Sequence, residues 1–137
     1  MITMTIPGKP ISKARPRFFR RGNFVGTYNS QMTEEGKFIF QVQSKLPPGF
    51  KPVTGPCLVE LCFEMPIPKS AKKHQLHQIE QNLPWYHDKK PDIDNLVKFV
   101  LDSIRNIIIS DDASVSSLRA VKRYGYQPST QITVEAL

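Results

Sequence analysis

Cysteine is scarce in this chain, and its scarcity excludes small domains that are held together by disulfides or by structural zinc. The 137 residues include two cysteines, Cys57 and Cys62. They lie five positions apart in a predicted β-strand, so their side chains point to opposite faces and cannot pair easily. Neither they nor the three histidines complete a set of zinc ligands at the usual spacing. We therefore expect no disulfide framework, and we interpret both thiols as buried apolar groups of a reducing compartment.

Long hydrophobic runs are also missing. No apolar stretch approaches the roughly 20 residues that a membrane-spanning helix needs, and residues 1–7 lack the basic and apolar blocks of a signal peptide. Apolar residues make up 39% of the chain, which is enough for a real core and argues against disorder. We expect one domain over residues 1–137, located in the cytoplasm and without a membrane partner.

Acidic residues are few, and their deficit favours a polyanionic partner. The chain has 12 Asp and Glu against 19 Lys and Arg, a formal charge of +7. Nucleic acid is the commonest polyanion that a soluble basic domain meets, although net charge can also serve solubility alone. Charge therefore favours nucleic-acid binding without establishing it.

The few acids are not spread evenly. Four of the 12 are Asp92, Asp94, Asp111 and Asp112, and a fifth, Asp102, lies midway between the two pairs. Such a cluster would repel a polyanion unless a cation lay between them. The combination indicates a metal-dependent enzyme that acts on nucleic acid.

Hydrophobic periodicity predicts an α+β domain. Helical spacing predicts helices over 33–46 and from about 94 to 108, with a short polar helix over 70–82. Alternation predicts strands over 2–6, 58–63, 115–124 and 131–134, and a hairpin of strands 18–21 and 24–28 that flank Gly22 and Asn23. Strands interrupted by two main helices favour a mixed or antiparallel sheet packed against those helices.

The predicted helix that begins near Asp94 has one polar edge. Asp94, Lys98 and Asp102 are spaced four residues apart and share this edge, while the apolar stripe faces the core. Two divalent ions about 3.5–4 Å apart, held by carboxylates, can drive phosphodiester hydrolysis, and Mg²⁺ prefers such oxygen ligands. Lys98 would add a positive charge for the scissile phosphate.

Each of these residues also has an ordinary structural explanation. Asp94 could be an N-cap or interact with the helix macrodipole. Lys98 could form solvated pairs with the acids four residues away, and Asp111 and Asp112 could form a turn. Taken singly these explanations suffice, but together they do not account for four clustered acids in a chain of +7 charge.

The same segment resembles the signature of RusA-type Holliday junction resolvases. The residues that match are His87, Lys90-Pro91-Asp92-Ile93-Asp94-Asn95-Leu96-Val97-Lys98, Asp102 and Asp111-Asp112-Ala113-Ser114-Val115. The start of the chain is similar to that of many phage and prophage members, in Pro7-Gly8-Lys9-Pro10 and Ala14-Arg15-Pro16-Arg17. The Asp-x-Asp-Asn-Leu-x-x-Lys core with the later Asp-Asp is the specific part of the match.

The resemblance implies a small homodimeric α+β endonuclease that needs Mg²⁺ or Mn²⁺ and no nucleotide cofactor. It would introduce paired, symmetric nicks across a four-way DNA junction in a bacterial cell. The family's essential acids carry over to Asp92, Asp94 and Asp112 as catalytic metal ligands, and its essential lysine to Lys98. The segment before the Asp-Asp pair is about one residue shorter than in the bacterial pattern, so Asp111 is the alternative to Asp112.

Two features concern the partner. A four-way junction has two-fold symmetry, and a symmetric dimer supplies two active sites related by that symmetry. Basic residues that could contact DNA phosphates are Lys13, Arg15 and Arg17 in an N-terminal arm, Lys72, Lys73, Lys89 and Lys90 in the polar connection, and Lys122, which fits the family pattern. Two other functions remain open: a DNA-binding module without catalysis, and a nuclease for flaps or other branched DNA.

Overall fold

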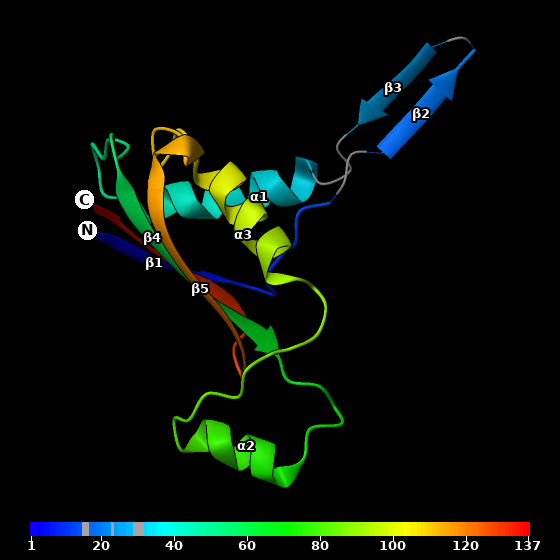
Figure 1. Ribbon diagram of the computed structural model, residues 1–137, viewed down its shortest axis with the longest axis vertical. Helices are drawn as coiled ribbons and strands as arrows, with labels where there is room; N and C mark the ends of the chain where they lie inside the picture. Colours follow the sequence, from blue (N-terminus) through cyan, green and yellow to red (C-terminus); the bar gives the residue numbers. More distant parts are fainter. Residues whose placement is uncertain (15–16, 23, 29–31) are drawn as a thin grey trace.

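The computed structural model describes residues 1–14, 17–22, 24–28 and 32–137. Its elements in chain order (Figure 1) are β1 (Ile2–Pro7), β2 (Arg17–Arg21), β3 (Phe24–Tyr28), α1 (Met32–Ser44), β4 (Cys57–Pro66), α2 (Lys73–Glu80), α3 (Ile93–Ile104), a 3₁₀ turn η1 (Asp112–Ser114), β5 (Val115–Gly125) and β6 (Ser129–Ala136). The predicted α+β class and single domain are confirmed.

Four strands form a mixed sheet in the order β1-β6-β4-β5. β6 pairs antiparallel with both β1 and β4, whereas β4 and β5 are parallel. A parallel pair needs a long crossover connection, which here is the segment 67–114 with α2 and α3. The acidic segment therefore belongs to the crossover between two adjacent strands.

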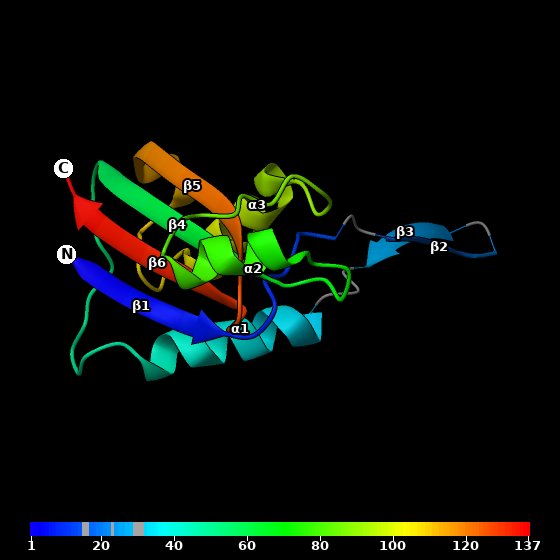
Figure 2. The ribbon, with the colours of Figure 1, turned by 90° about the horizontal axis from the view of Figure 1, so that it is seen from below.

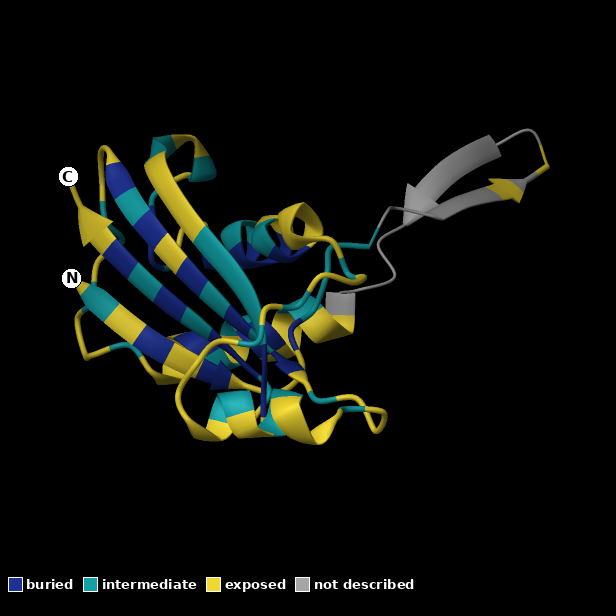
Figure 3. Cartoon of the chain, turned by 60° about the horizontal axis from the view of Figure 1, so that its bottom comes forward, coloured by how far each residue is buried: buried dark blue, intermediate teal, exposed yellow. Residues whose placement is uncertain are grey.

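Helices α1 and α3 pack on one face of this sheet (Figures 1 and 2). Buried and more exposed residues alternate along the central strands (Figure 3), as the pleat requires. The buried face of β4 consists of Cys57, Val59, Leu61, Phe63 and Met65. The rings of Phe38 in α1 and Phe99 in α3 meet edge to face with centroids 5.3 Å apart. Burial of this apolar surface fixes the orientation of α3.

Helix α3 ends at Ile104, sooner than the apolar spacing indicates. The spacing continues through Ile107 and Ile108, but Asn106 adopts a left-handed conformation with φ 64°. Its N–H donates to the carbonyl of Ile109 at 2.7 Å, which closes a turn. Asn tolerates this conformation better than most residues. Ile108 and Ile109 remain fully buried in the turn, so the apolar spacing here reflects burial and not helix.

The smaller elements follow the predictions with shifted ends. The polar helix α2 is present, but Lys72 and not Ser70 stands at its N-cap, where the Gln75 side chain accepts the Lys72 N–H at 2.9 Å. Cys57 and Cys62 lie on opposite faces of β4 with free thiols. In the part of the chain that the structure describes, no helix has the length and apolar character to cross a membrane.

The hairpin is confirmed as a separate two-stranded sheet of β2 and β3. The pairing runs from Arg17 opposite Tyr28 to Arg21 opposite Phe24, around Gly22 with φ 57°. Glycine adopts this left-handed conformation without steric cost. Asn23, the other residue predicted in the turn, lies outside the described residues.

Phe99 joins α3 to α1 and to the sheet, so its loss should destabilise the domain. Phe99→Ala should lower the free energy of unfolding by about 3–5 kcal/mol, because a cavity replaces a ring that is 1% exposed. Urea unfolding followed by circular dichroism measures the change. Phe40→Ala is the matched control on α1, at a side chain that is 72% exposed, and should change stability by less than about 0.5 kcal/mol. Equal losses in the two variants would contradict this core.

Candidate active site

The polar edge of α3 forms one side of the site. Asp94, Lys98 and Asp102 follow one another at intervals of about one helical turn. Asp92 occupies the N-cap position and Asp94 lies in the first turn, where the macrodipole stabilises negative charge. The opposite edge of the helix is buried through Leu96, Phe99, Val100, Ser103 and Ile104. The amphipathic sequence thus directs the charged groups outward.

Asp112 returns to the same side of α3 after the turn that ends the helix. Main-chain hydrogen bonds from Val53 to Ile108 at 2.8 Å and from Ser110 to Val53 at 2.9 Å fix the returning chain. Asp111 then caps η1, because its carboxylate accepts the Ala113 N–H at 3.3 Å. Of the two adjacent acids, Asp112 is the one that lines the cleft beside α3.

This cleft has a volume of about 510 Å³ and brings together four of the charged side chains: Asp94, Lys98, Asp102 and Asp112. Its apolar wall comes from α3 and β5, through Ile93, Val97, Leu101, Leu118 and Ala120. The helical rise separates Asp94 from Asp102 by about 12 Å along the axis. The cleft therefore extends along the helix.

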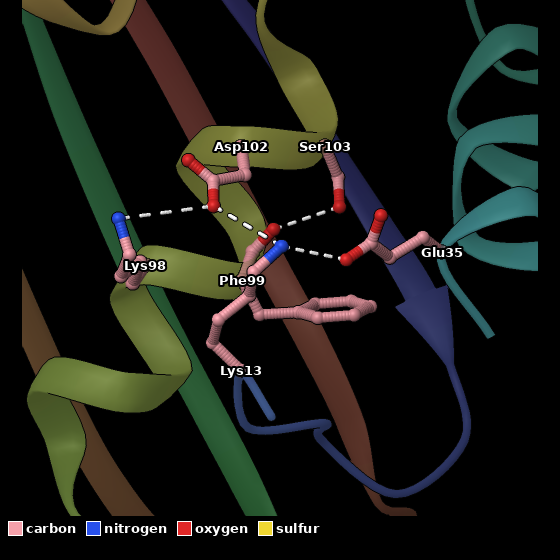
Figure 4. A network of polar contacts seen from close by, with 6 residues as sticks. All are labelled: Lys13, Glu35, Lys98, Phe99, Asp102 and Ser103. Atoms are coloured by element: carbon pink, nitrogen blue, oxygen red, sulfur yellow. Dashed lines mark hydrogen bonds and ion pairs between the residues drawn. The ribbon is translucent and has the colours of Figure 1, made fainter. Parts of the chain in front are cut away.

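Asp102 is also the centre of an ionic network that joins the N-terminal segment to α3 (Figure 4). Lys13 Nζ lies 2.6 Å from Glu35 Oε1 and 3.3 Å from Asp102 Oδ2. Lys98 Nζ lies 3.9 Å from the same Asp102 oxygen. The hydrogen bond with Glu35, followed by that with Asp102, raises the pKa of Lys13. Two carboxylates therefore compete with any DNA phosphate for Lys13.

The other predicted DNA-contacting residues fall into separate regions. Lys89, Lys90 and Lys122 lie around the loop before α3, and Lys122 Nζ donates to main-chain carbonyls of that loop. Lys72 and Lys73 lie at the start of α2, which Figure 1 shows at the far end of the molecule from α1. Arg15 lies outside the described residues, and Arg17 begins β2, with its side chain likewise outside what is described.

Nearly the whole chain matches one known protein family. The model of the family described as endodeoxyribonuclease RusA matches residues 7–135. The chain belongs to the RusA family. It is also similar to the uncharacterized protein YqaN of Bacillus subtilis (strain 168), with 28% identity over 138 residues that cover 97% of this chain and 94% of that protein. The resemblance predicted from the sequence motifs is confirmed.

In this RusA-family chain, Asp92 is not among the residues that line the cleft. Its two carboxylate oxygens lie 2.9 and 3.0 Å from Lys90 Nζ. The hydrogen bond from Lys90 holds the pKa of Asp92 below its usual value. The side chains of Lys90 and Asp92 are 85% and 51% exposed, so solvent screens the pair and another partner can displace either member.

The carboxylates do not form a closed metal cage. Among the described residues, no group of three or more His, Cys, Asp or Glu side chains is placed to hold an ion. The donor chemistry nevertheless fits Mg²⁺ or Mn²⁺, which take carboxylate oxygens. Mg²⁺ is usually bound by one or two carboxylates together with substrate phosphates and waters. An open arrangement such as that of Asp94 and Asp112 is compatible with this mode of binding.

Two members of the ionic network, Asp102 and Glu35, were not predicted from the sequence as catalytic, metal-binding or DNA-binding residues. Asp102 has a sequence signal, its spacing of four residues from Lys98. Glu35 has none, because its partner Lys13 lies 22 residues away along the chain. Residues so far apart meet only after α1 has packed beside α3.

His87 is a further residue near the site. Its ring packs against Tyr124 with centroids 4.8 Å apart, and its Nδ1 is buried without a hydrogen-bond partner among the described residues. Burial, and next the nearby Lys122 ammonium, lower the pKa of His87 below 6.5. The folded protein therefore favours the neutral imidazole.

Acid should destabilise the fold partly through His87. As the pH falls below about 6.5 the unfolded chain binds a proton at this histidine before the folded chain does, so stability falls with pH in that window. His87→Gln should reduce the loss of unfolding free energy between about pH 7.5 and pH 5, by up to about 1.4 kcal/mol for each unit by which the pKa is lowered. Urea unfolding at both pH values measures this loss. His74→Gln, at an exposed histidine of α2, should leave it unchanged, and an equal effect of both substitutions would contradict the assignment.

Proposed function

We propose that this protein is a divalent-metal-dependent endonuclease that resolves four-way DNA junctions by paired nicks. The observation that carries the proposal is the cleft along α3. It presents three aspartates and a lysine on the surface of a chain with a net charge of +7, in a family of endodeoxyribonucleases. Acids exposed on a basic surface are suited to hold a cation against a phosphate backbone.

The charged groups of the cleft would have different roles in phosphodiester hydrolysis. Asp94 and Asp112, joined by Asp92 when Lys90 releases it, would hold Mg²⁺ or Mn²⁺. When bound, the metal supplies charge neutralisation at the phosphate and an activated water. The carboxylates of the chain orient these groups along the edge of α3.

Lys98 is suited to act on the phosphate directly. Its side chain is 63% exposed, and its ion pair with Asp102 is long at 3.9 Å. The ammonium can therefore turn from Asp102 and donate to a phosphate oxygen as negative charge develops there. Leu101 and Leu118 border this position with apolar surface, which would exclude water and strengthen such a charge interaction once DNA covers the cleft.

A homodimer would match the substrate. The described part of one chain presents one such cleft, and two symmetric cuts across a junction need two. The exposed lysines of the loop before α3, Lys89 and Lys90, and those at the start of α2, Lys72 and Lys73, would contact the DNA backbone, which makes binding dependent on salt. We infer that the enzyme acts in the cytoplasm of a bacterial cell, where recombining DNA is found.

The substrate is tested by comparing branched and linear DNA. With Mg²⁺, the full chain should nick a synthetic four-way junction at paired symmetric positions, and faster than a flap or a linear duplex of the same sequence. EDTA should abolish the nicks and leave junction binding intact in a gel-shift assay. Faster cleavage of the flap would support a nuclease for branched DNA in general. Binding without nicks at any concentration of Mg²⁺ or Mn²⁺ would support a module without catalysis.

The metal ligands are tested by removing single charges. Asp94→Asn and Asp112→Asn should each reduce junction cleavage to background, because a neutral amide is a poor ligand for Mg²⁺. Junction binding should persist or tighten, since a charge that repels DNA is lost. Asp111→Asn is the matched control and should still cleave, because Asp111 caps η1. Cleavage by Asp112→Asn together with loss of cleavage in Asp111→Asn would reverse the assignment.

A further inference from the structure

Lys122 lies in β5, and its side chain reaches the loop that leads into α3. Its ammonium donates to the main-chain carbonyl oxygens of Lys89 and Pro91, each at 2.8 Å. These carbonyls lie on either side of Lys90, immediately before Asp92. The ammonium therefore binds the backbone of the turn that leads into the N-terminus of α3.

Lys122 is itself held in place by the sheet. It is paired with Phe63 of β4, which is fully buried. The main-chain carbonyl of Lys122 accepts the N–H of His87 at 3.0 Å. One residue of β5 thus binds the loop at both ends, through its main chain at His87 and through its side chain at residues 89 and 91.

The loop has little apolar burial of its own. Asp88, Lys89 and Lys90 are exposed, so the hydrophobic effect does little to fix their backbone. Hydrogen bonds from an ammonium are stronger than those between neutral groups. An ammonium has three N–H donors, and Lys122 directs two of them to this backbone. Lys89 and Lys90 are therefore better placed than Lys122 to contact a DNA phosphate.

We propose that Lys122 is a positioning residue, which holds the 89–91 loop so that Asp92 and the first turn of α3 present their carboxylates to a cation. The inference rests on the proposed function for the role of Asp92. It differs from the direct phosphate contact predicted from the sequence. Lys122 acts through the backbone of the loop and does not touch the reacting groups.

The first test needs neither metal nor DNA. In hydrogen–deuterium exchange of the full chain, Lys122→Met should speed amide exchange across residues 88–94 at least several-fold, while the core of β4 stays protected. Arg119→Met is the matched control, because it removes one positive charge from an exposed position of the same strand and should leave the loop unchanged. Lys122→Arg should restore part of the protection, since a guanidinium can also donate to carbonyls. Unchanged exchange in Lys122→Met would overturn the proposal.

The second test separates positioning from phosphate contact. In Lys122→Met the Mg²⁺ concentration for half-maximal junction cleavage should rise on the order of tenfold, as for the loss of residues that orient metal ligands. The rate at saturating Mg²⁺ should largely recover. Junction binding in EDTA should show the same salt dependence as Arg119→Met. If instead the salt slope falls by about one relative to that control, Lys122 contacts phosphate directly and the proposal is wrong.

Failure of the proposed function and failure of the positioning role of Lys122 would give different experimental results. If the wild-type chain nicks no DNA, the proposed function fails, while the exchange experiment still decides whether Lys122 holds the loop. If Lys122→Met does not fold, Lys122→Gln and Lys122→Arg carry the same comparison. A Mg²⁺ requirement in Lys122→Gln equal to that of the wild type, with an unprotected loop, would show that loop position does not govern the cation and would contradict the proposal.

Discussion

The parallel pairing of β4 with β5 is the constraint on which the candidate site depends. Adjacent parallel strands require a connection that travels back along the sheet, and α3 makes that return. Because its apolar edge covers the sheet, its polar edge must face outward. The entry to the helix carries Asp92 and Asp94, and the exit leads through Asp112 directly into β5. Asp94 and Asp112, which are 18 residues apart along the chain, are therefore brought to one cleft beside one helix.

Two acids at or near the cleft form ion pairs with lysine in the described part of the chain. Asp102 contacts Lys13 and Lys98, and Asp92 contacts Lys90. In the proposed function the pairs made by Lys90 and Lys98 are not obstacles, because the side chains of these two lysines are mostly exposed and such pairs are weak. A cation that takes Asp92 leaves Lys90 for phosphate, so metal and DNA would bind more favourably together than separately.

The sequence predicts the helix and its polar edge well, because both depend on spacing within a few turns. It predicts that Asp112 belongs to the candidate site only through the family motif. The choice between Asp111 and Asp112 depends on which carboxylate caps η1. It does not predict the partnership of Lys13 with Glu35, which depends on tertiary packing of α1. It also misjudges the apolar run at 107–109, where burial persists after the helix has ended. Contacts of Lys122 with main-chain carbonyls have no side-chain pattern that could have been recognised.

β5 links the two ends of the site. One of its faces supplies Leu118 and Ala120 to the wall of the cleft, and its outer edge receives residues 85–87 through hydrogen bonds at Lys122 and Tyr124. An edge strand normally leaves such groups unpaired, but here they anchor the loop that begins α3. Because β5 forms part of the wall of the cleft and also anchors the loop before α3, a shift of β5 would move both relative to the polar edge of α3. The position of Asp112 relative to Asp94 and Asp102 therefore depends on the sheet as well as on the helix.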